Sequence, residues 1–219
     1  MGALADLQSR LRQAAEHYMR ADPAHNLAHL DRVWQNAQQI ADANTNMRVL
    51  MAGAYLHDLV NLPKDHPDRS RASHQSADAA WPILQDLGYS NEESRAVQHA
   101  IIAHSFSAGV SPKTHEARVL RDADRLDALG AVGIARVFSV SGALGRTLYD
   151  PTNPFGKNRD LDESRFTIEH WYTKLLKLQH QMMTPAGKSL AKERTEFMVA
   201  YLEQFADEIG SPHHHATED

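Results

Sequence analysis

The adjacent pair His57-Asp58 is the first feature of the sequence that could carry chemistry. It directly follows the apolar run "MAGAYL" and precedes Leu59 and Val60. The loop after these residues holds Lys64 and Arg69. A histidine near a helix end is often a buried or capping residue, and an aspartate there is often a cap. The pair therefore becomes informative only if other side chains of matching chemistry can join it.

Imidazole and carboxylate groups are the ligands that the rest of the chain can add. The sequence holds 14 histidines and no cysteine, which excludes disulfides and thiolate metal sites. His29 and Asp124, together with His57 and Asp58, would offer two imidazoles and two carboxylates. Such a set suits a divalent first-row metal and leaves positions open for water and substrate oxygens. Spacing alone does not single out these four from the other histidines and acids.

Helix-period patterning dominates the elements that must position these groups. No segment alternates like a strand, so we predict an all-α fold. The segment around the His57-Asp58 pair is apolar nearly all round, which predicts a central helix. The stretch after residue 115 has possible breaks at Gly130 and Gly133. The expected helices span residues 3–20, 27–44, 46–59, 70–87, 90–105, 115–142, 163–183 and 187–208.

The composition is that of one globular domain. The 219 residues include 42% apolar and 23% charged residues, and the formal net charge is −5, which leaves no overall basic footprint for nucleic acid. The amino-terminal segment carries charges throughout, unlike a signal peptide, and no apolar run approaches membrane-spanning length. We expect a cytoplasmic protein that binds neither nucleic acid nor membrane. The end at 211–219 is expected to be disordered, and a homodimer is left open.

The order of the candidate ligands carries a resemblance to a known family. His29 in "HNLAHLDRVW", His57-Asp58 in "AYLHDLV" and Asp124 in "RDADRLDALG" resemble the H…HD…D pattern of the HD-domain metal-dependent phosphohydrolase superfamily. The wider stretches "HDLVNLPKDHPDRSRAS", "AHSFSA", "DADRLDALGAVGIARVFSVSGALG", "NPFGKNR" and "KLLKL" resemble its bacterial YedJ/YpgQ-type subgroup. One departure is "PTNPFGKNR", where the subgroup leads us to expect an acidic residue before Pro-Phe.

The resemblance implies a single domain with the HD-domain helical bundle over residues 1–210. Its HD core would cover about 25–130, and a helical elaboration would cover about 131–210. The subgroup implies hydrolysis of (deoxy)nucleoside triphosphates to monophosphate and pyrophosphate. The alternatives left open are a 5'-nucleotidase, a cyclic-nucleotide phosphodiesterase and a non-catalytic module that senses nucleotides.

The resemblance also implies that His29, His57, Asp58 and Asp124 bind a divalent metal ion. Manganese is the first expectation, with magnesium, cobalt, nickel, iron or zinc as alternatives. One ion is favoured, although some enzymes of the superfamily hold two. Without the resemblance, a core or capping role would be the better interpretation of each of the four residues.

Cationic side chains must face the phosphorus atom in such a reaction. Lys64 and Arg69 are the first candidates, because they follow the His57-Asp58 pair within one loop. Arg125 neighbours a candidate ligand and comes next. The long loop 149–166 is interpreted either as a lid over a phosphorylated ligand or as a surface excursion. In the first interpretation it contributes Lys157 and Arg159.

The remaining polar candidates have less specific signals. Asp127 shares a helix face with Asp124, and it either orients a ligand histidine or a water molecule or is a surface acid. His104 is expected near the substrate or as a proton carrier. No general base can be assigned from the sequence. Three further histidines are candidates for contacts with the substrate: His25, His66 and His99.

Overall fold

The computed structural model describes residues 2–18, 26–62 and 66–211. Over these residues the chain forms nine α-helices and two 3-10 helices and no β-strand, which confirms the prediction of an all-α fold. The chain divides into two compact units, the first made of residues 1–127 and 183–187, the second of residues 128–182 and 188–219. The prediction of one domain with a carboxyl-terminal elaboration stays a prediction.

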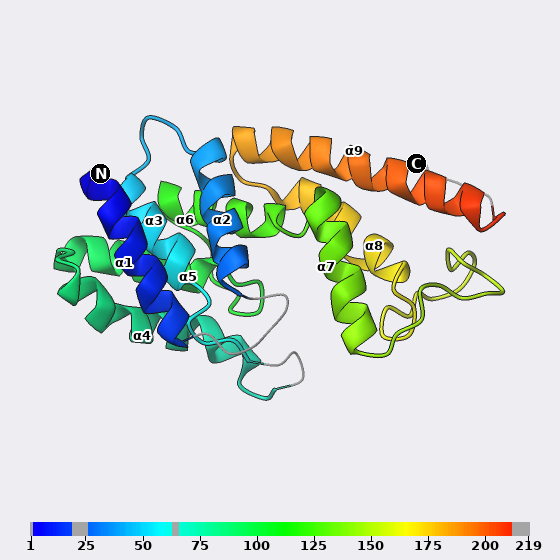
Figure 1. Cartoon of the computed structure of the whole chain (residues 1–219), viewed down its shortest axis with the longest axis horizontal. Coiled ribbons are helices and arrows are strands. Elements are labelled where there is room, and N and C mark those ends of the chain that lie inside the picture. The colour runs from blue at the N-terminus through cyan, green and yellow to red at the C-terminus, as the bar shows by residue number, and fades with distance from the viewer. Residues whose placement is uncertain (1, 19–25, 63–65, 212–219) are drawn as a thin grey trace. The chain divides into compact units, whose positions relative to one another are not determined.

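The first unit is built around helix α3, as its apolar sequence predicts. α3 packs against α1, α2, α5 and α6 (Figure 1), and all of its residues from Val49 to Leu56 are buried. Gly53 allows the close approach of α6, because a Cβ there would lie 3.0 Å from Leu120 Cδ2. The helices of this unit are α1 (Ala3–Tyr18), α2 (Leu27–Ile40), α3 (Met47–Leu56), η1 (Arg69–Arg71, a 3-10 helix), α4 (Ala72–Asp86), α5 (Asn91–His104) and α6 (His115–Leu126).

Side-chain caps fix where the helices of the first unit begin. The Asn26 carboxamide oxygen accepts a hydrogen bond from the backbone N–H of His29 at 3.1 Å, which caps α2. Ser90 caps α5 in a reciprocal arrangement with Glu93, a capping box. Because a cap sets the helical register, it also sets which side chains face the centre of the unit.

A buried carboxylate holds the start of α9 (Pro185–Glu208). Asp122 is fully buried and accepts hydrogen bonds from the backbone N–H of Met183 and from both the N–H and the hydroxyl of Thr184, at 2.7–3.0 Å. Thr184 in turn accepts from the N–H of Gly187 at 3.0 Å, in the manner of a helix cap. A Cβ at Gly187 would lie 2.6 Å from the Asp122 carboxylate, so this close contact requires glycine.

Replacing Asp122 by alanine is expected to lower the free energy of unfolding by roughly 3 kcal/mol, because buried donors would lose a charged acceptor. Denaturation in urea, followed by circular dichroism, measures the change. Asp86→Ala removes an exposed carboxylate at the end of α4 and should change the stability by less than about 0.5 kcal/mol. Equal stability of the two variants would contradict the assignment of Asp122 as a buried anchor.

The second unit departs from the predicted helix over 163–183. Residues 165–168 instead pair with 147–148 through backbone hydrogen bonds, among them Thr167 N–H to the Thr147 carbonyl and Ile168 N–H to the Leu148 carbonyl. The φ of Lys174 is −137°, outside the helical region, so the rest of this segment forms two short helices, one on each side of Lys174. The helices here are α7 (Gly130–Ala143), α8 (Glu169–Thr173), η2 (Leu175–Gln181, a 3-10 helix) and the part of α9 from residue 188.

The break predicted at Gly130 is confirmed. α6 ends at Leu126 and α7 begins at Gly130, whose φ of +68° favours glycine. Gly133 lies inside α7 and breaks no helix. It is instead a close-contact position, because a Cβ there would lie 2.2 Å from the Ala128 carbonyl oxygen.

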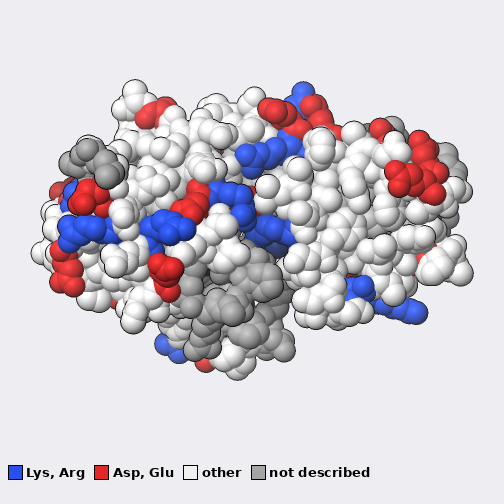
Figure 2. Space-filling view, in the orientation of Figure 1, with Lys and Arg blue, Asp and Glu red and all other residues white. Residues whose placement is uncertain are grey.

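Helix length and surface charge bear on whether the chain could contact a membrane or a charged partner. In the described part of the chain no helix alone is long and apolar enough to cross a membrane, and only the bent pair of α6 and α7 reaches that length and composition together. On the left and in the centre of the face shown in Figure 2, basic and acidic side chains lie next to one another, whereas near its right edge acidic side chains gather without basic neighbours.

Candidate metal centre

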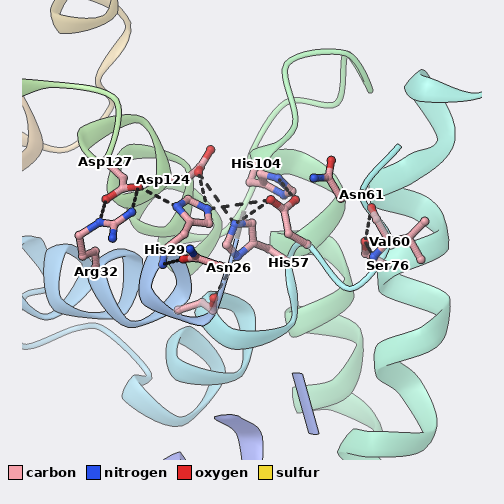
Figure 3. A network of polar contacts seen from close by, with 12 residues as sticks. Asn26, His29, Arg32, His57, Val60, Asn61, Ser76, His104, Asp124 and Asp127 are labelled. Carbon is pink, nitrogen blue, oxygen red and sulfur yellow. Dashed lines mark hydrogen bonds and ion pairs between the residues drawn. The ribbon is translucent and has the colours of Figure 1, made fainter. Parts of the chain in front are cut away.

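Three helix ends bring four candidate ligands together in the first unit. His29 lies in the first turn of α2, His57 directly follows α3 with Asp58 next to it, and Asp124 lies in the last turn of α6. Ligand atoms of His29, His57 and Asp124 lie within 4.8 Å of one another, and so do those of His57, Asp58 and His104 (Figure 3). His29, the His57-Asp58 pair, His104 and Asp124 are far apart in the sequence, so their proximity is a result of the fold.

The distances within this cluster suit ligands of one ion. The Nε2 atom of His29 lies 3.6 Å from Asp124 Oδ1 and 3.9 Å from Asp58 Oδ2. The Nε2 atom of His57 lies 3.7 Å from Asp58 Oδ2 and 3.9 Å from Asp124 Oδ1. These separations are too long for hydrogen bonds. Two atoms that are each about 2.1 Å from one ion lie at most about 4.2 Å apart, so all four pairs are close enough.

Hydrogen bonds to backbone carbonyls fix which ring nitrogen of His57 and of His104 carries a proton. His57 Nδ1 lies 2.9 Å from the Ala54 carbonyl, and His104 Nδ1 is hydrogen-bonded to the Ile101 carbonyl. A carbonyl can only accept, so both Nδ1 atoms carry a proton, and in the neutral imidazole each Nε2 atom then presents a lone pair. His57 Nε2 is buried and has no hydrogen-bond partner among the described residues. A buried lone pair of this kind fits a metal ligand.

The protonation states also suit metal binding. Burial lowers the pKa of His29 and that of His104, which favours the neutral imidazole. Burial alone would raise the pKa of Asp124, but the neighbouring histidines outweigh it and lower the pKa. Neutral imidazole and ionised carboxylate are the forms that bind a metal ion.

Asp127 lies behind His29 rather than in the cluster. Its Oδ2 atom is 2.7 Å from His29 Nδ1, and only 1% of the side chain is exposed. Arg32 donates to both oxygens of the same carboxylate, at 2.6 and 3.0 Å. Asp127 thus makes the contact that an orienting carboxylate would make. Sequence reasoning missed Arg32, whose only signal is its position three residues after His29 on α2.

A small pocket opens beside Asp58 and His104, which line it. Arg69 lines it, and its guanidinium donates to the Asn61 carboxamide at 3.0 Å and to the Leu62 carbonyl. The segment after the His57-Asp58 pair is tied to α4 through the hydrogen bonds of the Ser76 hydroxyl (Figure 3). The other lining residues are Val60, Asn61, Ala72, Ser73, Ser105 and Ser107.

Three further predicted residues of the first unit are not part of the cluster. His99 Nε2 accepts a hydrogen bond from the backbone N–H of Lys113 at 2.9 Å, and His66 Nδ1 accepts one from the N–H of Asp68 at 3.1 Å. Arg125 is largely buried, which lowers the pKa of its guanidinium to about 10. Their roles at a substrate stay predictions.

The two candidates of the long loop belong to the second unit. Arg159 forms an ion pair with the buried Glu169, whose Oε2 lies 3.1 Å from its Nη1, and Lys157 is exposed. Their contribution to a lid stays a prediction. Lys64 and His25 lie outside the described residues.

Known proteins resemble this chain in sequence and in fold. The model of the family described as HD domain matches residues 26–129. The uncharacterized protein YpgQ of Bacillus subtilis is 31% identical over 190 residues, which are 84% of each chain. The structure of Bacillus subtilis YpgQ in complex with ADP matches with a TM-score of 0.73 and 31% identity, over 93% of this chain and 95% of that one. The structure of an HD-superfamily hydrolase from Bacillus thuringiensis matches with a TM-score of 0.71 and 32% identity, over 94% of this chain and 98% of that one. This chain therefore belongs to the HD superfamily of metal-dependent phosphohydrolases.

Proposed function

We propose that this phosphohydrolase acts on nucleotides and hydrolyses (deoxy)nucleoside triphosphates to monophosphate and pyrophosphate. The observation that carries the proposal is the pocket in which a guanidinium, that of Arg69, lies together with Asp58 and His104. A cation beside candidate metal ligands suits a substrate with several negative charges. The complex of the relative YpgQ with ADP supports a nucleotide as the ligand.

His29, His57, Asp58 and Asp124 would hold the divalent ion, with manganese as the first expectation. When bound, the ion supplies Lewis-acid polarisation of a phosphoryl oxygen and a nucleophile at neutral pH. All four side chains come from helices or directly follow one, and such rigid placement lowers the cost of ordering the site.

The other residues of the site bind and orient. Arg69 contacts phosphate oxygens, and its bonds to Asn61 and Leu62 hold the guanidinium in place. His104 donates its Nδ1 proton to the Ile101 carbonyl, so its Nε2 can accept a proton on the pocket side. Asp127 keeps the proton of His29 on Nδ1 and leaves Nε2 for the ion.

A product assay tests this function. The protein is stripped of metal, reloaded with Mn²⁺ and offered nucleoside mono-, di-, tri- and cyclic phosphates. We expect equal amounts of pyrophosphate and monophosphate from triphosphates, and no turnover before reloading. Orthophosphate from monophosphates would make the protein a nucleotidase, and opening of cyclic phosphates would make it a phosphodiesterase. Binding of nucleotide and metal without any turnover would make it a sensor.

A further inference from the structure

The amino end of helix α4 lines the pocket beside the candidate metal centre. Ala72 and Ser73, the first two residues of the helix, share the pocket with Asp58 and His104. α4 is 15 residues long, and no side chain caps its start. The N–H of Ala72 already donates to the Arg69 carbonyl of η1, so Ser73 is the first residue of α4 whose N–H a ligand could take up. The amino end of a helix carries a partial positive charge and backbone N–H groups that attract anions.

The hydroxyl group of Ser73 is an independent sign of a ligand. Only 4% of the residue is exposed, and its Oγ atom has no hydrogen-bond partner among the described residues. Ser76, one turn further along α4, is also buried, but its hydroxyl is hydrogen-bonded to Val60. A buried hydroxyl without a partner destabilises a fold. A pocket-lining serine in this state therefore lacks an acceptor that a ligand can supply.

Arg69 completes the chemistry of this corner of the pocket. It lies in η1, which directly precedes α4, and its Nη1 atom is held by Asn61 and by the Leu62 carbonyl. A guanidinium offers five N–H donors in a fixed plane, so a group anchored through one nitrogen can still donate from others. Phosphate oxygens are the acceptors that a guanidinium and a helix amino end share.

We propose that the amino end of α4, the Ser73 hydroxyl and the Arg69 guanidinium form the subsite for the terminal phosphates of the substrate. These are the two phosphates that leave as pyrophosphate, so this inference rests on the proposed function. The subsite lies in the same pocket as Asp58 and His104. Charge at the helix end and at Arg69 offsets the charge of the leaving pyrophosphate, and Ser73 gains its missing acceptor.

Binding of inorganic pyrophosphate tests the subsite directly. Titration calorimetry is carried out on Mn²⁺-loaded protein from which excess metal has been removed. Ser73→Ala and Arg69→Gln should each weaken pyrophosphate binding by about tenfold or more, as expected for the loss of a hydrogen bond to a charged group. Ser141→Ala is the matched control, because Ser141 is also buried with no partner for its hydroxyl among the described residues but lies in α7. It should leave the affinity unchanged.

Thermal melting of the ligand-free variants separates binding from folding. Ser73→Ala should melt no lower than the parent protein, because it removes a buried hydroxyl that makes no hydrogen bond. Weaker binding without a loss of stability would therefore indicate a ligand contact. Unchanged pyrophosphate affinity in both Ser73→Ala and Arg69→Gln would overturn the subsite.

The outcomes for the subsite and for the proposed function are distinct. Parent protein that releases pyrophosphate from triphosphates but does not bind pyrophosphate would overturn the subsite and leave the function in place. Parent protein that binds pyrophosphate through Ser73 and Arg69 but hydrolyses no triphosphate would support the subsite and overturn the function. Protein that does neither would overturn both.

Discussion

Asp58→Asn is expected to weaken Mn²⁺ binding by at least 100-fold and to lower the rate of triphosphate hydrolysis by about a thousandfold. Asp58 contributes one of two carboxylates to the cluster, and its Oδ2 atom lies within 3.9 Å of the Nε2 atoms of both His29 and His57. Lewis-acid catalysis by a metal ion supplies several kcal/mol of stabilisation to the transition state, and each 1.36 kcal/mol is about tenfold in rate. Titration calorimetry with Mn²⁺ and an assay of released pyrophosphate measure the two effects.

The control for this variant is Asp86→Asn, which removes an exposed carboxylate at the far end of α4. It should retain both metal affinity and rate. The helical circular dichroism of Asp58→Asn should match that of the parent protein, since the apolar residues of α3 remain. Full Mn²⁺ affinity and full activity in Asp58→Asn would show that the ion binds elsewhere.

Asp127→Asn is expected to weaken Mn²⁺ binding by about 10- to 100-fold, the usual effect of losing a partner that orients a metal ligand. Asp127 can only accept a hydrogen bond, so at 2.7 Å it keeps the proton of His29 on Nδ1. An asparagine can turn its N–H₂ group toward Nδ1 and favour the tautomer with the proton on Nε2, the atom that faces Asp58 and Asp124. Metal affinity and the nitrogen chemical shifts of His29 in the metal-free protein report the change.

Arg32→Gln should have a smaller effect in the same direction, because Arg32 acts on His29 only through Asp127. The matched control is Arg12→Gln, which breaks another arginine–aspartate pair of the first unit, with Asp31 at 3.2 Å. It should leave Mn²⁺ affinity unchanged. Wild-type affinity together with an unchanged His29 tautomer in Asp127→Asn would rule out the orienting role.

Local sequence signals sufficed for the helices of the first unit. The apolar pattern of α3 is set by residues within a few positions of one another, so the helical period predicts it. The prediction of one helix over 163–183 was wrong, because residues 165–168 form hydrogen bonds with the backbone of residues 147–148. Such a pairing depends on a distant segment, and no helical pattern reports it.

The candidate site shows the same division between local and distant information. Spacing did not separate His29, His57, Asp58 and Asp124 from other histidines and acids, and their order was informative only through its resemblance to a family. The role of Arg32 could not be predicted from the sequence, because its partner Asp127 lies 95 residues away in the chain. The importance of the Ser73 hydroxyl depends on its burial at the pocket, which a sequence does not display.

The location of a bound ion tests the central claim most directly. Crystals of the protein grown with Mn²⁺ can be measured at the manganese absorption edge, where anomalous scattering locates the metal independently of the refined protein. We predict one strong peak between His29 Nε2, His57 Nε2 and the carboxylates of Asp58 and Asp124, with each ligand about 2.0–2.3 Å from it. A fully occupied peak elsewhere, with none between these four side chains, would contradict the assignment of this cluster as the metal centre.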